Sequence, residues 1–182
     1  DVYYQKYQNM LPVKYGASAT DKKLVTIILD ISKSMLNYSR VLIARAAACK
    51  ILDVLEDNDV VAVIEFSGNT EVLSAPVNVG DHREELKEKI TGVNGKQGTF
   101  MSAAMQQTLA MIKDLPYESK EAFLISDGLP FDGSYTVDGD IIGDCAKQFK
   151  AEGIALSTIN SACNTSDAIS LMKKIAAYGG GQ

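Results

Sequence analysis

LVTIILDISKSM, residues 24–35, decides the fold because it joins an apolar run to a short group of oxygen-bearing side chains. The residues from Leu24 to Leu29 show no polar alternation, which is typical of a strand buried on both faces of a sheet. Asp30 then stands at the carboxyl end of that strand, where open α/β sheets form their ligand crevices. Asp and Ser also cap helices, so this spacing alone leaves a helix or turn start as an alternative.

Length and composition indicate one globular domain with a substantial core, since the chain has 182 residues, of which 46% are hydrophobic and 23% charged. The net charge of −5 and the even spread of Lys and Arg argue against a nucleic-acid partner. No apolar run reaches the roughly 18 residues of a membrane span, so we expect no membrane insertion by this segment. We expect the isolated domain to be a monomer.

The chain begins DVYYQKYQNM, without an initiator Met or the pattern of a signal peptide. We interpret it as a segment of a longer protein, with residues 1–23 as an extension or linker and residues 24–182 as the domain. Its three cysteines, Cys49, Cys145 and Cys163, are scattered, which favours small buried thiols over disulfides or a zinc site. The single histidine, His82, has no second ligand nearby and is expected at the surface.

Periodicity along the rest of the chain predicts alternating strands and helices. We expect a helix over 38–56, a buried strand over 59–66, and an edge strand over 70–79 that contains Pro76 and is joined to the buried strand by a hairpin at 67–69. The remaining elements are predicted as a helix at 82–90, a loop at 91–99, a helix at 101–112, a strand at 121–128, a helix at 139–153, a strand at 154–160 and a helix at 167–180. This order predicts a doubly wound α/β fold, with a mostly parallel sheet, one antiparallel edge strand and helices on both faces.

Three loops at the carboxyl edge of this sheet carry oxygen ligands. They are Asp30, Ser32 and Ser34 after the first strand, Thr99 in KQGTFM, and Asp127 after AFLIS. Carboxylates and hydroxyls without sulfur or imidazole suit a hard divalent cation, and Mg²⁺ fits best, with Mn²⁺ or Ca²⁺ possible. Each part is a weak signal by itself, but the set in this order predicts a metal site.

These residues resemble the metal-ion-dependent adhesion site of von Willebrand factor type A domains, and the resemblance extends from about Leu24 to Gly181. That family has Asp-x-Ser-x-Ser after the first strand, a Thr in the next ligand loop and Asp-Gly after the fourth strand. The matching positions are Asp30, Ser32, Ser34, Thr99 and Asp127-Gly128. Two neighbours depart from the pattern: Lys33 replaces a common glycine, and Phe100 stands where a small or polar residue is frequent.

The resemblance implies protein recognition, in which the metal attracts a Glu or Asp carboxylate of a partner. Asp30 is expected to bind the metal directly and Asp127 through water, while Phe100, Leu129 and Phe131 set apolar groups around the charged centre. Lys33 either lowers metal affinity or steers an anionic partner. In some members the last helix, here about residues 166–178, shifts on metal engagement. The resemblance also favours a cell-surface or membrane-anchored parent protein.

Two alternatives stay open. A metal-dependent phosphoester hydrolase also places an Asp after its first parallel strand, but it pairs that residue with a second Asp two positions on, where this chain has Ser32. We therefore expect no enzymatic activity. The other alternative is a structural domain whose metal site is engaged by a neighbouring domain of the same polypeptide.

Overall fold

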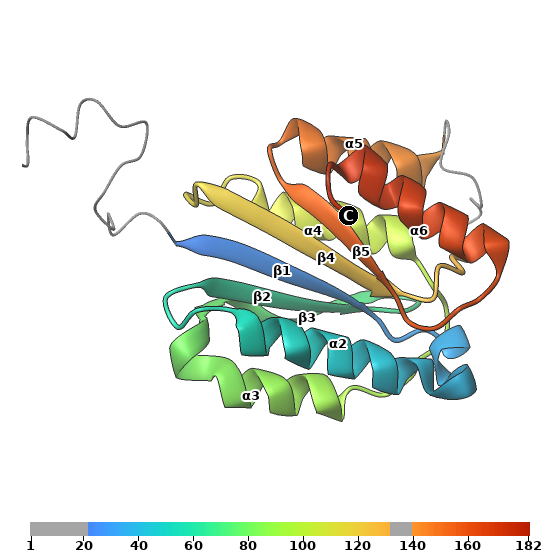
Figure 1. Cartoon of the computed structure of the whole chain (residues 1–182), viewed down its shortest axis with the longest axis horizontal. Helices are drawn as coiled ribbons and strands as arrows, with labels where there is room; N and C mark the ends of the chain where they lie inside the picture. Colours follow the sequence, from blue (N-terminus) through green and yellow to red (C-terminus); the bar gives the residue numbers. More distant parts are fainter. Residues whose placement is uncertain (1–21, 132–139) are drawn as a thin grey trace, which may run out of the picture.

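The computed structural model describes residues 22–131 and 140–182, and its centre is a five-stranded sheet in the order β3-β2-β1-β4-β5 (Figure 1). The strands are β1 (Lys23–Asp30), β2 (Val60–Phe66), β3 (Thr70–Asn78), β4 (Ser119–Ser126) and β5 (Ala155–Asn160). All neighbouring strands pair in parallel except β3, which runs antiparallel to β2 at one edge. The predicted α/β fold class is confirmed, as is the edge position of the Pro76 strand.

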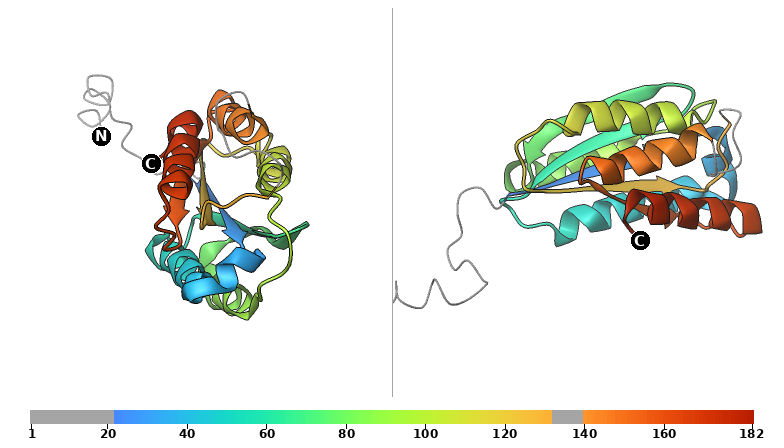
Figure 2. Two further views of the ribbon diagram at one scale, coloured as in Figure 1. Left: turned by 90° about the vertical axis from the view of Figure 1, so that its right-hand side faces the viewer. Right: turned by 90° about the horizontal axis from the view of Figure 1, so that it is seen from above.

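Helices cover both faces of the sheet (Figure 2). Side chains of α2 (Arg40–Val54) and α3 (Val79–Gly92) share one apolar core with one face of the strands. Side chains of α4 (Met101–Ile112), α5 (Ile141–Ala151) and α6 (Ser166–Gly179) form a second core on the other face. Every residue from Leu24 to Asp30 is buried, as expected for a strand between two layers.

Some element boundaries differ from the sequence predictions. The helix expected over 38–56 is divided into a 3₁₀ helix, η1 (Lys33–Ser39), and α2, because Ser39 has a left-handed backbone with φ of 59°. The helix expected at 82–90 begins at Val79, where the Asn78 side chain accepts a hydrogen bond from the amide of Gly80. The strand expected over 121–128 ends at Ser126, so Asp127 is the first residue after it.

The helix expected over 139–153 is shorter and runs from Ile141 to Ala151, with Asp140 capping it through the amide of Gly143. Position 139 lies outside the described residues. Cys145 and Cys163 are buried free thiols as predicted, whereas Cys49 is half-buried. His82 is half-buried, and its Nδ1 lies 3.0 Å from the carbonyl oxygen of Asn78. Within the described ranges, no helix has the length and apolar character that a membrane span requires.

Candidate metal centre

Asp30 lies at the carboxyl end of β1 with both carboxylate oxygens engaged and its side chain fully buried. The amide of Ser32 donates to Oδ1 at 2.8 Å, and the hydroxyl of Ser126 donates to Oδ2 at 2.6 Å. Ser126 is the last residue of β4, and its Oγ also accepts from the amide of Gly128 at 3.0 Å. These bonds fix the Asp30 carboxylate between β1 and the loop after β4.

The two serines after Asp30 face each other across the start of η1. Their Oγ atoms lie 3.1 Å apart, and the Ser32 hydroxyl does not cap the helix. Ser32 is buried, Ser34 is half-buried and Lys33 between them is exposed. The alternation that the sequence shows at these positions therefore places both hydroxyls together and directs Lys33 outward.

The loop that carries Thr99 is tied to its neighbours through the backbone. The amide of Lys96 donates to the carbonyl of Ile31 at 2.7 Å, and the amide of Gly68 donates to the carbonyl of Gln97 at 2.7 Å. Gly98 has φ of +86°, and a Cβ built there would lie 2.5 Å from Cα of Gly68. Only glycine fits this position without strain, so the close approach of the two loops depends on it.

An ion pair between exposed Lys96 and buried Glu65 anchors the same loop. Lys96 Nζ lies 2.8 Å from Oε1 of Glu65 and 3.0 Å from Oε1 of Glu71. The Glu65 side chain is almost completely buried in the C-terminal part of β2, whereas Lys96 and Glu71 are exposed. Thr99 follows three residues after Lys96 and is itself buried, so this ion pair helps to hold the segment that carries it.

Asp127 is fully buried and forms an ion pair with Arg40, the first residue of α2. Nη1 of Arg40 donates to Oδ2 at 2.8 Å, and the amide of Leu129 donates to Oδ1 at 3.1 Å. The loop then returns to the Thr99 segment, because the amide of Phe131 donates to the carbonyl of Thr99 at 3.1 Å. Asp127 is therefore held by protein donors on both oxygens, as Asp30 is, but one of its donors is a charged guanidinium.

The two buried carboxylates, Asp30 and Asp127, are not equally compensated by positive charge. Burial raises the pKa of Asp30 to about 6, and the negative charge of Asp127 adds to this, while hydrogen bonds from Ser126 and Ser32 oppose it. The guanidinium of Arg40 lies at hydrogen-bond distance from Asp127, whereas Asp30, which is equally buried, accepts hydrogen bonds from the neutral groups of Ser32 and Ser126. A bound cation would remove this imbalance.

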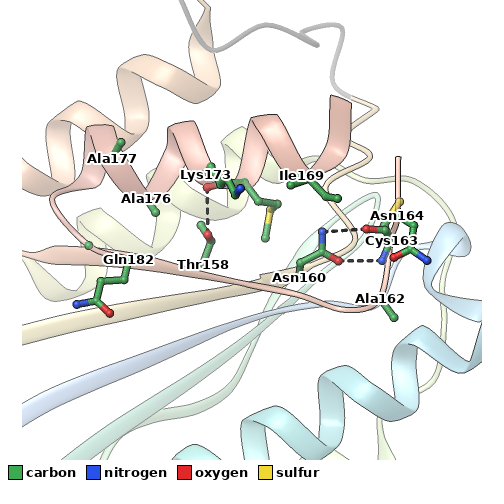
Figure 3. A pocket seen from close by; sticks show the side chains of 12 residues that line it. Thr158, Asn160, Ala162, Cys163, Asn164, Ile169, Lys173, Ala176, Ala177 and Gln182 are labelled. Atoms are coloured by element: carbon green, nitrogen blue, oxygen red, sulfur yellow. Dashed lines mark hydrogen bonds between the residues drawn. The ribbon is translucent and has the colours of Figure 1, made fainter. Parts of the chain in front are cut away.

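A hollow of about 420 Å³ opens beside these residues, lined by Lys33, Ser34, Gly98, Thr99, Leu129, Pro130 and Phe131. A larger hollow of about 580 Å³ lies between β5 and α6 (Figure 3). It contains none of the five predicted ligands, and its main polar groups are already bonded: Asn160 pairs with the backbone of Cys163, and Thr158 donates to the carbonyl of Met172. We therefore assign the candidate site to the smaller hollow.

The five residues predicted from the sequence come together at one edge of the sheet. Hydrogen bonds join Asp30, Ser32 and Ser34, and the smaller hollow brings Ser34 beside Thr99. Asp127 lies next to Ser126, which bonds Asp30. In the part of the chain that the structure describes, no three His, Cys, Asp or Glu side chains cluster as a metal site, so a cation here needs the hydroxyls as ligands. An all-oxygen donor set of this kind fits Mg²⁺ or Mn²⁺.

Sequence reasoning missed two residues of the site, Arg40 and Ser126. Arg40 stands 87 residues from Asp127 in the chain, at the start of an amphipathic helix, where an Arg is ordinarily read as solvent-exposed. Ser126 was read as the end of a buried strand. The sequence did contain a signal for Ser126. It is a polar residue directly before the Asp-Gly pair, where β4 reaches the site.

Comparison with known proteins gives a family and a fold. The model of the von Willebrand factor type A domain matches residues 25–129, which is more than half of the chain. The structure is similar to that of the conserved hypothetical protein BatB from Bacteroides thetaiotaomicron, with 22% identity, a TM-score of 0.70 and 87% of each chain covered. No curated protein gives a significant match.

Two further solved structures share the fold. The vWF domain of the type V pili tip protein Mfa5 from Porphyromonas gingivalis has 13% identity and a TM-score of 0.72, with 90% of this chain and 89% of that one covered. Manganese-loaded TRAP from Plasmodium vivax has 16% identity and a TM-score of 0.67, with 87% of this chain and 63% of that one covered.

Proposed function

We propose that this chain, which belongs to the von Willebrand factor type A domain family, binds a protein partner by holding one of its acidic side chains on a divalent cation. The observation that carries this proposal is the buried pair Asp30 and Asp127 beside three hydroxyls and an open hollow, in which Arg40 pairs with Asp127 and neutral donors bond Asp30. Buried carboxylates in excess of their cations are costly, and a metal ion is the usual compensation.

The ion would be held by Asp30, Ser32, Ser34 and Thr99, with Asp127 acting through water while Arg40 retains one of its oxygens. Mg²⁺ is the expected cation, with Mn²⁺ or Ca²⁺ as substitutes, and the manganese-loaded state of the TRAP structure supports a divalent ion. When bound, the ion supplies positive charge and a coordination position that a partner carboxylate can take.

Charge counting explains why an acidic partner is preferred. The carboxylates of Asp30 and Asp127 contribute −2 and the Arg40 guanidinium contributes +1, so the protein part of the centre carries −1. A divalent cation converts this to +1, because the serine and threonine ligands are neutral. The metal therefore changes the sign of the charge that these three residues present to a carboxylate, and we expect recognition to depend on the metal.

Catalysis is not required by this arrangement. The position two residues after Asp30, where a hydrolase would place its acid or base, is Ser32, and the single histidine of the chain lies on α3. The proposal therefore favours recognition over phosphoester hydrolysis. The partner carboxylate is expected to come from another protein, with a neighbouring domain of the same polypeptide as the second source.

Residues 24–182 are proposed to form the whole recognition domain, with residues 1–23 as an extension. The pilus tip protein Mfa5 and the pilus adhesin SpaC from Lactobacillus rhamnosus GG are among the solved structures with this fold. An aerotolerance-related membrane protein from Bacteroides fragilis is another. These neighbours support a parent protein at the cell surface or anchored to a membrane.

The test is capture of partners by immobilised domain from surface and soluble fractions of the source cells, in Mg²⁺ and in chelator. A matched bait carries Asp30→Asn, which keeps the shape of the side chain and removes its charge. The proposal expects a partner retained by the native bait in Mg²⁺ and lost both in chelator and on the Asp30→Asn bait. A partner retained equally under all three conditions would refute metal-bridged recognition.

A further inference from the structure

An apolar rim surrounds the opening of the candidate centre. Of the five phenylalanines in the chain, Phe66, Phe123 and Phe149 are buried or half-buried, whereas Phe100 and Phe131 are 44% and 69% exposed. Both exposed rings flank the Thr99 segment, and Leu129, which is 37% exposed, lies in the wall of the same hollow. Large apolar side chains gathered at one opening are a feature of interaction surfaces.

The rim is built on fixed backbone. The amide of Phe100 donates to the carbonyl of Ser67 at 2.7 Å, and the amide of Phe131 donates to the carbonyl of Thr99 at 3.1 Å. The amide of Leu129 is bound by the Asp127 carboxylate. The apolar rim is therefore attached to the same loops that present the ligands, and an occupant of the centre must contact both.

The polar side of the hollow carries a positive charge. Lys33 lines it, is exposed, and forms no ion pair with another residue of the described ranges. The chain as a whole carries a net charge of −5, so Lys33 and a bound cation would together make this opening a local positive site on an acidic protein. Positive charge therefore favours an acidic side chain of the partner at this opening. The apolar rim favours an apolar side chain next to that acidic residue.

We infer that the partner presents its acidic side chain directly beside a large apolar side chain, such as Phe, Leu or Met. The carboxylate goes to the cation and the adjacent apolar group packs between Leu129, Pro130 and Phe131. This inference rests on the proposed function and adds the chemistry of the residue next to the acid. Apolar contact around a desolvated polar anchor is how binding hot spots gain affinity.

Three blocked peptides test the inference, each with two glycines on either side of Glu-Phe, Glu-Ser or Gln-Phe. Their binding to the 182-residue chain is measured by NMR titration in millimolar Mg²⁺ and in chelator. We expect Glu-Phe to bind at least about fivefold more tightly than Glu-Ser, a modest difference for one apolar side chain. The Phe131→Ser variant should lose this preference. Val54→Ser should keep it, because Val54 is equally exposed, at 69%, but ends α2 far from the site.

The outcomes separate the two proposals. Equal affinity for Glu-Phe and Glu-Ser in Mg²⁺, with both lost in chelator, overturns the apolar-neighbour inference and leaves the proposed function intact. Equal affinity for Glu-Phe and Gln-Phe, or binding that survives chelator, overturns both. Absence of binding by every peptide up to about 10 mM, far weaker than an ordinary recognition contact, also overturns the inference.

Discussion

Replacing Arg40 with Met should have opposite effects on folding and on metal affinity. The substitution keeps the apolar part of the side chain and removes the guanidinium that lies 2.8 Å from Oδ2 of Asp127. Asp127 is fully buried, and 11% of the Arg40 side chain is exposed, so solvent screens this pair weakly. Without Arg40, buried Asp127 loses the cation with which it pairs, and buried Asp30 keeps the neutral donors of Ser32 and Ser126.

The loss of stability and the gain in metal affinity can both be estimated from general values for buried charges. Breaking a buried ion pair by removing one partner typically costs about 3–5 kcal/mol, which is a large part of the stability of a domain. The same change makes the centre more negative by one unit. For an assumed separation of about 7 Å, a unit charge and a divalent ion interact by roughly 1 kcal/mol in water and about 5 kcal/mol at an effective permittivity of 20. Metal affinity should therefore rise about tenfold or more.

Urea unfolding in chelator measures the first effect, and calorimetric titration with Mg²⁺ measures the second. If the variant is unfolded in chelator, recovery of the folded state in Mg²⁺ and the milder Arg40→Lys variant provide the comparison. Arg45→Met is the matched control, since Arg45 also lies on α2 but bonds the backbone carbonyl of Val93. A stability loss below about 1 kcal/mol together with unchanged metal affinity would refute the charge-coupled centre.

Three further predictions concern the same centre. Gly98→Ala should destabilise the fold by about 2 kcal/mol or more in chemical unfolding, because Gly98 has φ of +86° and the new Cβ would collide with Gly68. Gly92→Ala is the control and should not destabilise the fold in this way, because its Cβ would meet nothing within 4 Å. Burial raises the pKa of Asp30 to about 6, above its unfolded value, so the folded state binds more protons. Stability without metal should thus fall by up to ~3 kcal/mol between about pH 4 and pH 6, and Asp30→Asn should lack this loss. Thr99→Ala should weaken Mg²⁺ binding by calorimetry, while Thr108→Ala, which removes a hydroxyl bonded within α4, should leave it unchanged.

The sheet, and the position of the loops that carry the proposed ligands, could be predicted because their signals are local. The unbroken apolar run before Asp30 and the alternation of Ser32 and Ser34 depend on residues close in sequence, and strand order then brings Thr99 and Asp127 to the same edge. The left-handed Ser39 that separates η1 from α2 has no comparable signal, since serine is rarely chosen for that conformation.

The charge balance of the centre could not be predicted. Arg40 faces Asp127 because η1 turns the chain before α2 begins, and helical periodicity alone gives no indication of that turn. The anchoring of the Thr99 loop by Lys96 and Glu65 is equally hidden, because these residues belong to segments 31 positions apart in the chain. Contacts of this kind become visible only when the packing of the loops is known.

Paramagnetic relaxation by Mn²⁺ tests the central claim most directly, because it locates the ion on the protein. Amide resonances of the ¹⁵N-labelled chain are followed as Mn²⁺ is added at substoichiometric levels, with Mg²⁺ as the competing diamagnetic ion. The account predicts that broadening is confined to amides near residues 31–35, 97–100 and 127–130, and that excess Mg²⁺ reverses it. Broadening centred on exposed carboxylates such as those of α3, or none at these three loops, would contradict the account.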